Sequence, residues 1–310
     1  DDDTEHFGII ETVKLETNAE DGDYLTVSGR FLISLLSRRI IYPTLSFKTE
    51  AAYAEIVQAA VRQNSMLNDN RSIPGLEFGT VTGDCWQKTA QLQVSYENLM
   101  EWVFKICELI GGTANIRLAE VGTHTGLFKL YLDLLQGTDR SVLQDDNAHI
   151  IFSDAYSNLL DFQYLLDGSE YRNFAYILGC GEGTERKMTT YSSGDDSSGM
   201  ERYEVYVDAK DISDEEQDGN KDTVPIPDVD YIEILKSRGA ESLVPVTQKS
   251  ESTIAANDIQ YSYNKDYFTG DYVTVKHRRF GLSQNKIQLI GMIESYDQNG
   301  RSLTPTFKGA

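Results

Sequence analysis

Alternating glycines in the segment LGCGEGTER, which contains Gly179, Gly181 and Gly183, are the first pattern that could do chemistry. Glycine-rich loops bind phosphate groups because their backbone amides can approach the phosphate oxygens closely. The spacing here fits neither GxGxxG nor the P-loop, which needs four residues between its glycines and a following Lys-Ser or Lys-Thr. The next segment is predicted to be a strand, so no helix N-terminus would face a phosphate. We therefore interpret these glycines as a β-bulge or as a close approach of two backbone segments.

Residues that could bind a metal or act as a nucleophile are scattered along the sequence. None of the acidic runs has the alternating ligands, central glycine and terminal glutamate of an EF-hand loop. The four histidines are far apart, and no G-x-S-x-G motif is present. The cysteines, which are too few and too dispersed for a disulfide framework or CxxC zinc binding, are Cys85, Cys107 and Cys180. The sequence therefore predicts no catalytic residue, no cofactor and no metal, with three buried or half-buried thiols in a reducing compartment.

The segment KHRRF contains the densest basic group in the sequence, formed by Lys276, His277, Arg278 and Arg279. Two interpretations are open. A solvated turn explains each of these residues taken singly, because exposed charges contribute little to stability. As a group they could instead contact an acidic neighbour, since complementary charge guides association. We take the four residues as a candidate interface and expect it to face acids such as those of residues 214–216.

The charge balance of the whole chain limits its partners. The 310 residues include 49 acidic and 28 basic ones, which gives a formal net charge of −21. Nucleic-acid affinity depends on Lys and Arg displacing counterions from phosphates, so we expect no specific nucleic-acid binding. No run approaches the roughly 18 apolar residues that a membrane span needs, so we expect no membrane insertion.

Strand and turn signals are clearest from Lys265 to Phe307. Three runs rich in Val, Ile, Tyr and Thr are separated by turn residues, as in a meander of antiparallel strands. Gly270 and Asp271 are predicted to form one turn. Asn299 and Gly300 are predicted to form another, because Asn-Gly supplies the two positive φ values of a type I′ hairpin turn.

The patterns together predict a β-rich α+β fold with two β-barrel-like domains and a small α/β unit between them. Residues 1–47 supply strands and a short helix of the first barrel-like domain, and residues 48–147 form the α/β middle unit. Residues 148–310 form the second barrel-like domain, with a helical insert near 228–243. Because a meander buries only one face, we expect strands within residues 159–207 to pair with it and close the second barrel.

Two helices are predicted in the middle unit, one capped by Thr49 and one from Ser95 to Ile110. The second has the clearest periodicity, since Leu99, Val103 and Cys107 recur at helical spacing and predict the face that packs on a sheet. A pair of glycines follows Ile110 and ends this helix.

Several spaced segments point together to one family. In the second half of the chain they are IIFSDAYSNLLDFQYLLDGSEYRNFAYILGCGEGTERK, ERYEVYVDAKDIS and NKDYFTGDYVTVKHRRFGLSQNKIQLIGMIESYDQNGRSLTPTF. In the first half they are GIIETVKLET, LTVSGRFLISLLSRRII and SYENLMEWVFKICELIGG. Over nearly its whole length the chain resembles the tail-hub family of bacteriophage tails, which includes siphovirus-type baseplate hub proteins and the N-terminal module of tail-associated lysins. Only DDDTEHF precedes GIIETVKLET, where this family normally has further strands, so the completeness of the first barrel-like domain is open.

The resemblance implies a structural protein of the virion and not an enzyme. Such a protein forms a homotrimeric ring at the distal tip or baseplate of the tail, closes the tail tube, anchors the spike or receptor-binding apparatus and opens for DNA ejection. Its implied partners are the distal tail protein, the tape-measure protein and the spike or receptor-binding components, and it is made in the host cytoplasm. DNA would pass through the ring without specific binding, which agrees with a net charge of −63 for three copies at −21 each.

The alternative function is that of a peptidoglycan- or polysaccharide-degrading tail-associated enzyme, or of the non-catalytic front half of one. Glycosidases need two carboxylates beside a cleft lined by aromatic residues. The 49 acidic residues and 18 tyrosines leave room for such a pair. Hydrolysis of peptidoglycan by this polypeptide distinguishes the two functions.

Overall fold

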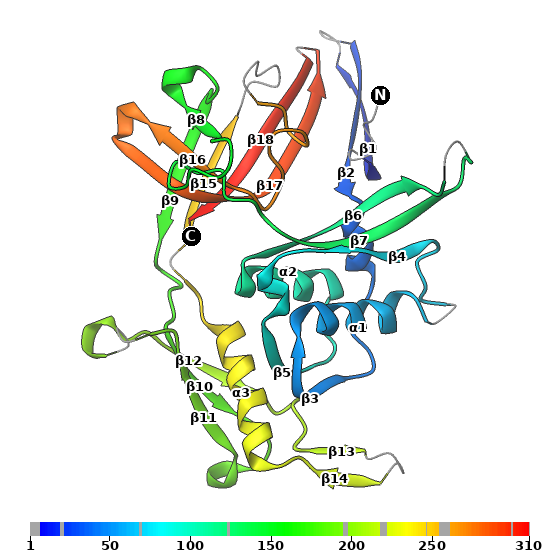
Figure 1. Ribbon diagram of the computed structural model, residues 1–310, viewed down its shortest axis with the longest axis vertical. Coiled ribbons are helices and arrows are strands. Elements are labelled where there is room, and N and C mark those ends of the chain that lie inside the picture. The colour runs from blue at the N-terminus through cyan, green and yellow to red at the C-terminus, as the bar shows by residue number, and fades with distance from the viewer. Residues whose placement is uncertain are drawn as a thin grey trace. The chain divides into compact units, whose positions relative to one another are not determined.

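The structure, a computed structural model, describes residues 7–18, 22–67, 70–122, 125–194, 198–217, 222–245, 247–253, 261–298 and 300–309. The chain divides into two compact units, Asp1–Leu135 and Gln136–Ala310. Strands make up most of the regular structure in both units and are accompanied by a few helices, which confirms the β-rich α+β class (Figure 1). The three-domain division at residues 47 and 147 stays a prediction.

The first unit begins with an amphipathic β-hairpin. Strands β1 (Gly8–Asn18) and β2 (Gly22–Phe31) pair in antiparallel fashion as a two-stranded sheet. Val13 lies opposite Val27, and Leu15 lies opposite Leu25. Because side chains alternate between the two faces of a strand, these four apolar residues share one face of the hairpin and polar residues occupy the other. The short 3₁₀-helix η1 (Leu32–Arg38) follows β2.

Helix α1 (Tyr53–Ser65) begins later than the sequence predicts. The expected cap, Thr49, lies inside strand β3 (Leu45–Ala52), which pairs with β5 (Thr89–Val94). Ladder pairing of Ala51 and Ala52 with β5 therefore keeps the end of β3 extended, although its composition is compatible with a helix. Strand β4 (Leu76–Val81) and the 3₁₀-helix η2 (Asp84–Gln87) lie between α1 and β5.

Helix α2 (Leu99–Ile110) has the predicted buried face but a different start. Leu99, Val103 and Cys107 are all buried, as predicted. The helix is capped by Asn98 and not by Ser95, because the Asn98 Oδ1 accepts hydrogen bonds from the backbone N–H groups of residues 100 and 101. Residue 96 has a φ of 59°, which a helix cannot contain. The backbone at Gly111 turns left-handed, with a φ of 74°, and ends the helix.

A second sheet of the first unit has the order β4-β7-β6, with β6 spanning Gly112–Glu120 and β7 spanning Phe128–Gln136. The β4–β7 pairing is parallel and shifts register between Phe78 and Val81. The buried Asp133 side chain fills this break, since it accepts a hydrogen bond from the Thr80 N–H at 2.6 Å and pairs with Arg117 at 2.6 Å. Gly79 is required beside it, because a Cβ there would lie 2.1 Å from the Asp133 Oδ1.

The second unit is built on a six-stranded sheet of order β8-β16-β17-β18-β15-β9 that curls into a half-barrel (Figure 1). The predicted meander forms β16 (Tyr272–His277), β17 (Leu282–Asp297) and β18 (Gly300–Gly309). Strand β15 (Thr247–Thr253) joins β18 to β9 (Asp161–Asp167), and β8 (Ile151–Ser153) pairs with β16. The core contains Phe152, Tyr267 and Phe307, whose rings make close contacts.

The prediction that strands within residues 159–207 pair with the meander is wrong for β9 as a direct pairing, because β9 pairs with β15 and only shares the six-stranded sheet with the meander. It is also wrong for β10 (Phe174–Leu178), β11 (Met188–Ser192) and β12 (Glu204–Asp208), which form a separate sheet of order β11-β10-β12. Helix α3 (Asp228–Ser242) packs on one face of this sheet and gives it a core of its own, which explains why it does not join the half-barrel (Figure 1). A small ribbon of β13 (Glu215–Gln217) and β14 (Thr223–Pro225) precedes α3.

Candidate functional site

The basic segment lies at the tip of the β16–β17 hairpin. Lys276 and His277 end β16, and Arg278 and Arg279 begin the 3₁₀-turn η6 (Arg278–Phe280). A glycine with a φ of 62° closes the turn before β17. The hairpin therefore presents Arg278, Arg279 and Phe280 side by side in an exposed turn.

Stacked rings and one carboxylate hold this turn against the rest of its unit. The His277 ring stacks on Phe280 at 4.5 Å and on Phe162 of β9 at 5.2 Å. The backbone N–H of Arg278 donates to the Asp154 Oδ1 at 3.1 Å. This hydrogen bond is the main reason why the pKa of Asp154 lies below its ordinary value. The turn is thus pinned at its base while its tip stays in solvent.

The charges of the basic segment are largely uncompensated. The Arg278 Nε lies 3.9 Å from the Asp154 Oδ2, at the limit of an ion pair, and the Arg278 side chain is 74% exposed. Lys276 and Arg279 form no ion pair with any residue that the structure describes. No arrangement of a nucleophile and a base occurs at this turn, so what it offers chemically is positive charge beside an exposed aromatic ring.

The predicted turn at Gly270 and Asp271 is a buried anchoring point. The Asp271 carboxylate accepts hydrogen bonds from the N–H of Thr138 at 2.7 Å, from the N–H of Phe268 at 3.1 Å and from the Arg140 Nε at 2.9 Å. Gly270 has a φ of 102° and lies so close to Gly137 that a Cβ on the latter would be 1.7 Å from the Gly270 carbonyl oxygen. The turn therefore fixes residues 137–140 to the start of β16.

The other predicted turn falls partly outside the described residues, because Asn299 is not among them. Gly300 has a φ of 104°, and it pairs with Asp297 at the end of the β17–β18 ladder. The type I′ assignment to Asn299 and Gly300 stays a prediction.

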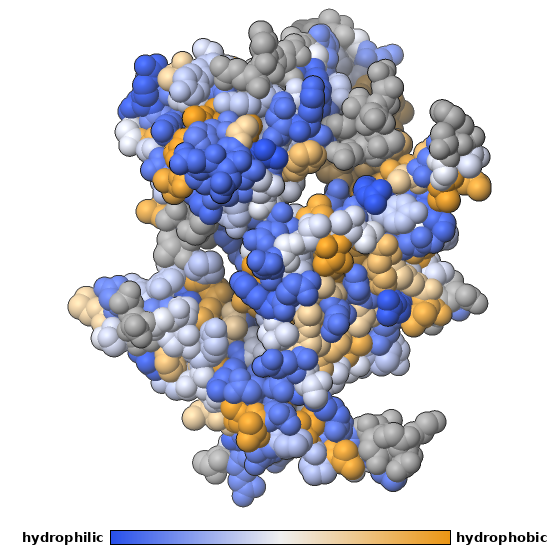
Figure 2. All heavy atoms as spheres, in the orientation of Figure 1, coloured by the Kyte–Doolittle hydropathy of each residue, from blue (hydrophilic) through white to orange (hydrophobic). Residues whose placement is uncertain are grey.

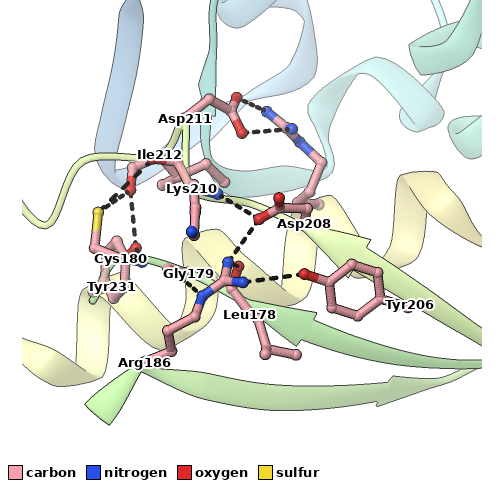
Figure 3. A network of polar contacts seen from close by, with 11 residues as sticks. Leu178, Gly179, Cys180, Arg186, Tyr206, Asp208, Lys210, Asp211, Ile212 and Tyr231 are labelled. Carbon is pink, nitrogen blue, oxygen red and sulfur yellow. Dashed lines mark hydrogen bonds and ion pairs between the residues drawn. The ribbon is translucent and has the colours of Figure 1, made fainter. Parts of the chain in front are cut away.

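The alternating glycines form part of a polar network that sequence reasoning did not find (Figure 3). The Arg186 guanidinium donates to the carbonyls of Leu178 and Gly179, to the Tyr206 hydroxyl and to the Asp208 carboxylate. Gly181 confirms the close-approach interpretation, because a Cβ there would lie 2.8 Å from the Glu185 carbonyl oxygen, whereas at Gly179 a Cβ would lie 2.4 Å from the Tyr231 hydroxyl oxygen. The network is structural, since the Arg186 guanidinium is used on four acceptors of the protein itself.

The Tyr231 hydroxyl connects the glycine loop to α3. It donates to the Ile212 carbonyl and accepts from the N–H of Cys180, both at 2.9 Å. Burial raises the pKa of the Tyr231 phenol, so it stays protonated and keeps its donor role. In the sequence only the alternating glycines indicated this junction, and no pattern around Ile212 or Tyr231 predicted their contacts with it.

Exposed apolar residues form a further candidate surface on the β1–β2 hairpin. The apolar residues on one face of this hairpin are each 46–79% exposed, and they are Ile10, Val13, Leu15, Leu25 and Val27. A smaller apolar group lies at the end of the β6–β7 hairpin, where Figure 2 shows hydrophobic residues on the surface. Contiguous exposed apolar surface usually marks a place of interaction.

The remaining candidate groups suggest no chemistry. Cys85 and Cys107 are buried thiols, and burial raises the pKa of the Cys107 thiol to about 12. Cys180 is half-buried and free, so the three thiols are placed as predicted. Within the described ranges, no three His, Cys, Asp or Glu side chains are grouped so that they could hold a metal ion. No helix in the described part of the chain is long and apolar enough to cross a membrane.

Comparison with solved structures shows that the fold of the chain is similar to that of phage tail proteins. Its fold is similar to that of the tail protein from Neisseria meningitidis MC58, with 13% identity, a TM-score of 0.52 and coverage of 97% of this chain and 79% of that one. It is also similar to that of the prophage MuSo2 43 kDa tail protein from Shewanella oneidensis, with 13% identity, a TM-score of 0.50 and coverage of 96% and 77%. None of the curated protein sequences matches the chain.

At these identities the two structures show a shared fold only. The family is shown by the sequence, since residues 1–307 match the model of the Siphovirus ReqiPepy6 Gp37-like protein family. This match confirms the resemblance to siphovirus tail proteins that the spaced segments indicated. The chain therefore belongs to the Siphovirus ReqiPepy6 Gp37-like protein family.

Proposed function

We propose that this tail protein is a structural hub subunit at the distal tip or baseplate of the virion. Three copies form a ring that closes the tail tube, anchors the spike or receptor-binding apparatus and opens for DNA ejection. The distal tail protein and the tape-measure protein are its proposed neighbours along the tail axis. The family membership supports a place in the tail, and the surface of the first unit supports assembly.

The observation that carries the proposal is the exposed apolar face of the β1–β2 hairpin. An isolated two-stranded sheet is marginally stable in water, and it needs a covering layer on its apolar face. The cross-strand pairs Val13–Val27 and Leu15–Leu25 lie on that face and are mostly exposed in the single chain. A neighbouring copy in a ring would cover this face at every subunit boundary. A closed ring of three needs such contacts between two different patches, because odd-order symmetry excludes self-complementary ones.

Measurement of mass in solution tests the proposal. Light scattering should give about three times the 34.8 kDa of one chain at micromolar concentration. The variant Val13→Asp/Val27→Asp places two charges on the apolar face and should be monomeric. The matched control Thr12→Asp/Ser28→Asp adds the same two charges at the neighbouring cross-strand pair on the polar face and should still form trimers. A parent protein that stays monomeric would falsify the ring.

The function proposed requires shape and contacts but no reaction. The alternative, a peptidoglycan- or polysaccharide-degrading enzyme, makes an opposite prediction for an enzymatic assay, whereas the non-catalytic front half of such an enzyme would show no turnover. Turnover of purified peptidoglycan by this polypeptide, lost on substitution of one carboxylate, would establish the enzyme. The ring proposal expects no turnover above buffer.

A further inference from the structure

The η6 turn combines exposed arginines, an exposed aromatic ring and positive charge that is largely uncompensated by nearby carboxylates. Arg278, Arg279 and Phe280 are exposed, and the Phe280 side chain is 70% accessible. Arg140, Arg186 and Arg202 lie only 2.6–2.9 Å from an acidic side chain, so their charge is used within the chain. The turn instead leaves the charge of Arg279 without a counter-ion among the described residues.

The turn is also held in place before any partner binds. Its backbone is fixed by the hydrogen bond from Arg278 to Asp154, and its aromatic ring is fixed by the stack of Phe280 on His277. A pre-ordered surface loses less conformational entropy on binding than a mobile loop does. Arginine and large aromatic side chains are also among the residues that contribute most to binding at protein interfaces. The turn is therefore built like an anchor for a protein partner.

The charge of the chain indicates which partner this anchor fits. Each copy carries a net charge of −21, so two copies repel one another wherever their acidic surfaces meet. A contact between copies is favoured where an uncompensated cationic patch of one meets acids of the next. In a ring of odd order the two contacting patches differ, so a basic patch on one side and an acidic one on the other satisfy the symmetry.

We infer that the η6 turn is an intersubunit anchor, in which Arg278, Arg279 and Phe280 dock onto the acidic surface of a second copy of this chain. This inference rests on the proposed ring and names one of its contacts. The apolar hairpin supplies burial, and the η6 turn supplies charge complementarity and fixes which patches meet. The anchor acts through side chains whose removal leaves the core of the second unit intact.

Charge reversal with a matched control tests the anchor. Arg278→Glu/Arg279→Glu changes the net charge of the chain from −21 to −25, because each replacement of Arg by Glu lowers the net charge by two. Lys88→Glu/Lys265→Glu gives the same net charge at two exposed lysines that form no ion pair in the described part of the chain. We expect the first variant to weaken assembly by about tenfold or more in apparent Kd at low salt. The control should weaken it by much less.

Two further variants keep the test independent of folding. Arg279→Gln removes one exposed charge that has no described ion-pair partner, and Phe280→Ser removes the aromatic ring without changing charge. Both should melt like the parent protein and weaken assembly several-fold. If the parent assembles and the Arg278/Arg279 variant assembles equally well, the anchor is wrong while the ring stands. If the parent is monomeric, the ring and the anchor fail together.

Discussion

Removal of the Asp271 carboxylate should destabilise the second unit strongly and leave the first unit almost unchanged. The Asp271 side chain is 5% exposed and accepts three hydrogen bonds, two from backbone N–H groups and one from Arg140. Asp271→Ala leaves the N–H groups of Thr138 and Phe268 without their acceptor and leaves the Arg140 charge without its partner. The turn before β16 and residues 137–140 would lose their common anchor.

The magnitude follows from those three lost contacts. A buried donor left unsatisfied costs about 1–3 kcal/mol, and breaking a buried ion pair by removing one partner costs roughly 3–5 kcal/mol. Arg140 is 20% exposed and can recover some hydration, so the sum falls below full additivity. We expect a loss of about 3–5 kcal/mol in the free energy of unfolding of the second unit. For a unit of this size that corresponds to a fall in melting temperature of roughly 6–20 °C.

The distribution of tryptophan allows the two units to be followed separately. Both tryptophans of the chain, Trp86 and Trp102, are buried in the first unit. Tryptophan fluorescence therefore reports unfolding of the first unit, whereas far-ultraviolet circular dichroism reports strands of both. Asp271→Ala should lower the dichroism transition without lowering the fluorescence transition. Asp146→Ala, at an exposed aspartate of the same unit, is the matched control and should change neither.

Unchanged melting of Asp271→Ala would contradict the role assigned to the Asp271 carboxylate. If Asp271→Ala melts within about 1 °C of the parent by both probes, the three hydrogen bonds do not carry the stability assigned to them. Asp271→Asn gives a finer check, because an amide keeps one acceptor oxygen but places an N–H₂ group against one of the backbone donors. It should fall between the parent and the alanine variant.

Two other predictions concern the first unit and the pH response of the second. Val103→Asp buries an unpaired carboxylate in the core of the first unit, at a cost of several kcal/mol, and should abolish the cooperative fluorescence transition. The control Lys105→Asp, on the exposed side of α2, should retain that transition. A Val103→Asp protein that melts normally would contradict the packing assigned to α2. Burial alone would raise the pKa of Asp139, but hydrogen bonds from Lys286 and Ser141 hold it below its ordinary value. Its contribution to stability is therefore fully present above the unfolded pKa near 3.9 and is lost as pH falls through the lower folded pKa. Lys286→Met should reduce that acid-dependent loss in the second unit, and an unchanged pH profile would show that the pair does not contribute.

The elements that were predicted correctly are those defined by patterns over a few neighbouring residues. The meander became β16, β17 and β18 because alternating β-branched residues and turn residues act over a few positions. The buried face of α2 followed from the spacing of Leu99, Val103 and Cys107 in the same way. The start of α1 was misplaced because β5, the strand that pairs with β3, is remote in sequence.

Contacts between distant residues were beyond the reach of the sequence. Asp271 bonds to Thr138 across 133 positions, and Asp133 repairs a ladder break at Thr80 across 53. Nothing near either aspartate distinguishes it from an exposed acid. The run FAYIL of β10 is equally suited to a half-barrel or to the small sheet covered by α3, and only the presence of α3 decides between them.

The two proposed contacts respond to salt in opposite ways, and this determines how assembly must be measured. Added salt screens the attraction of Arg278 and Arg279 for acids, but it also screens the general repulsion between copies at −21 each, over a Debye length of about 8–10 Å. Salt strengthens burial of the apolar hairpin face if it changes it at all. The assembly of the parent protein can therefore rise, fall or stay level with salt, and that trend alone identifies neither contact. The difference between Arg278→Glu/Arg279→Glu and Lys88→Glu/Lys265→Glu is free of this ambiguity, because both variants carry the same net charge and the same hairpin. That difference should be largest at low salt and shrink as salt rises, and a difference that is constant with salt would show that the turn contributes by shape and not by charge.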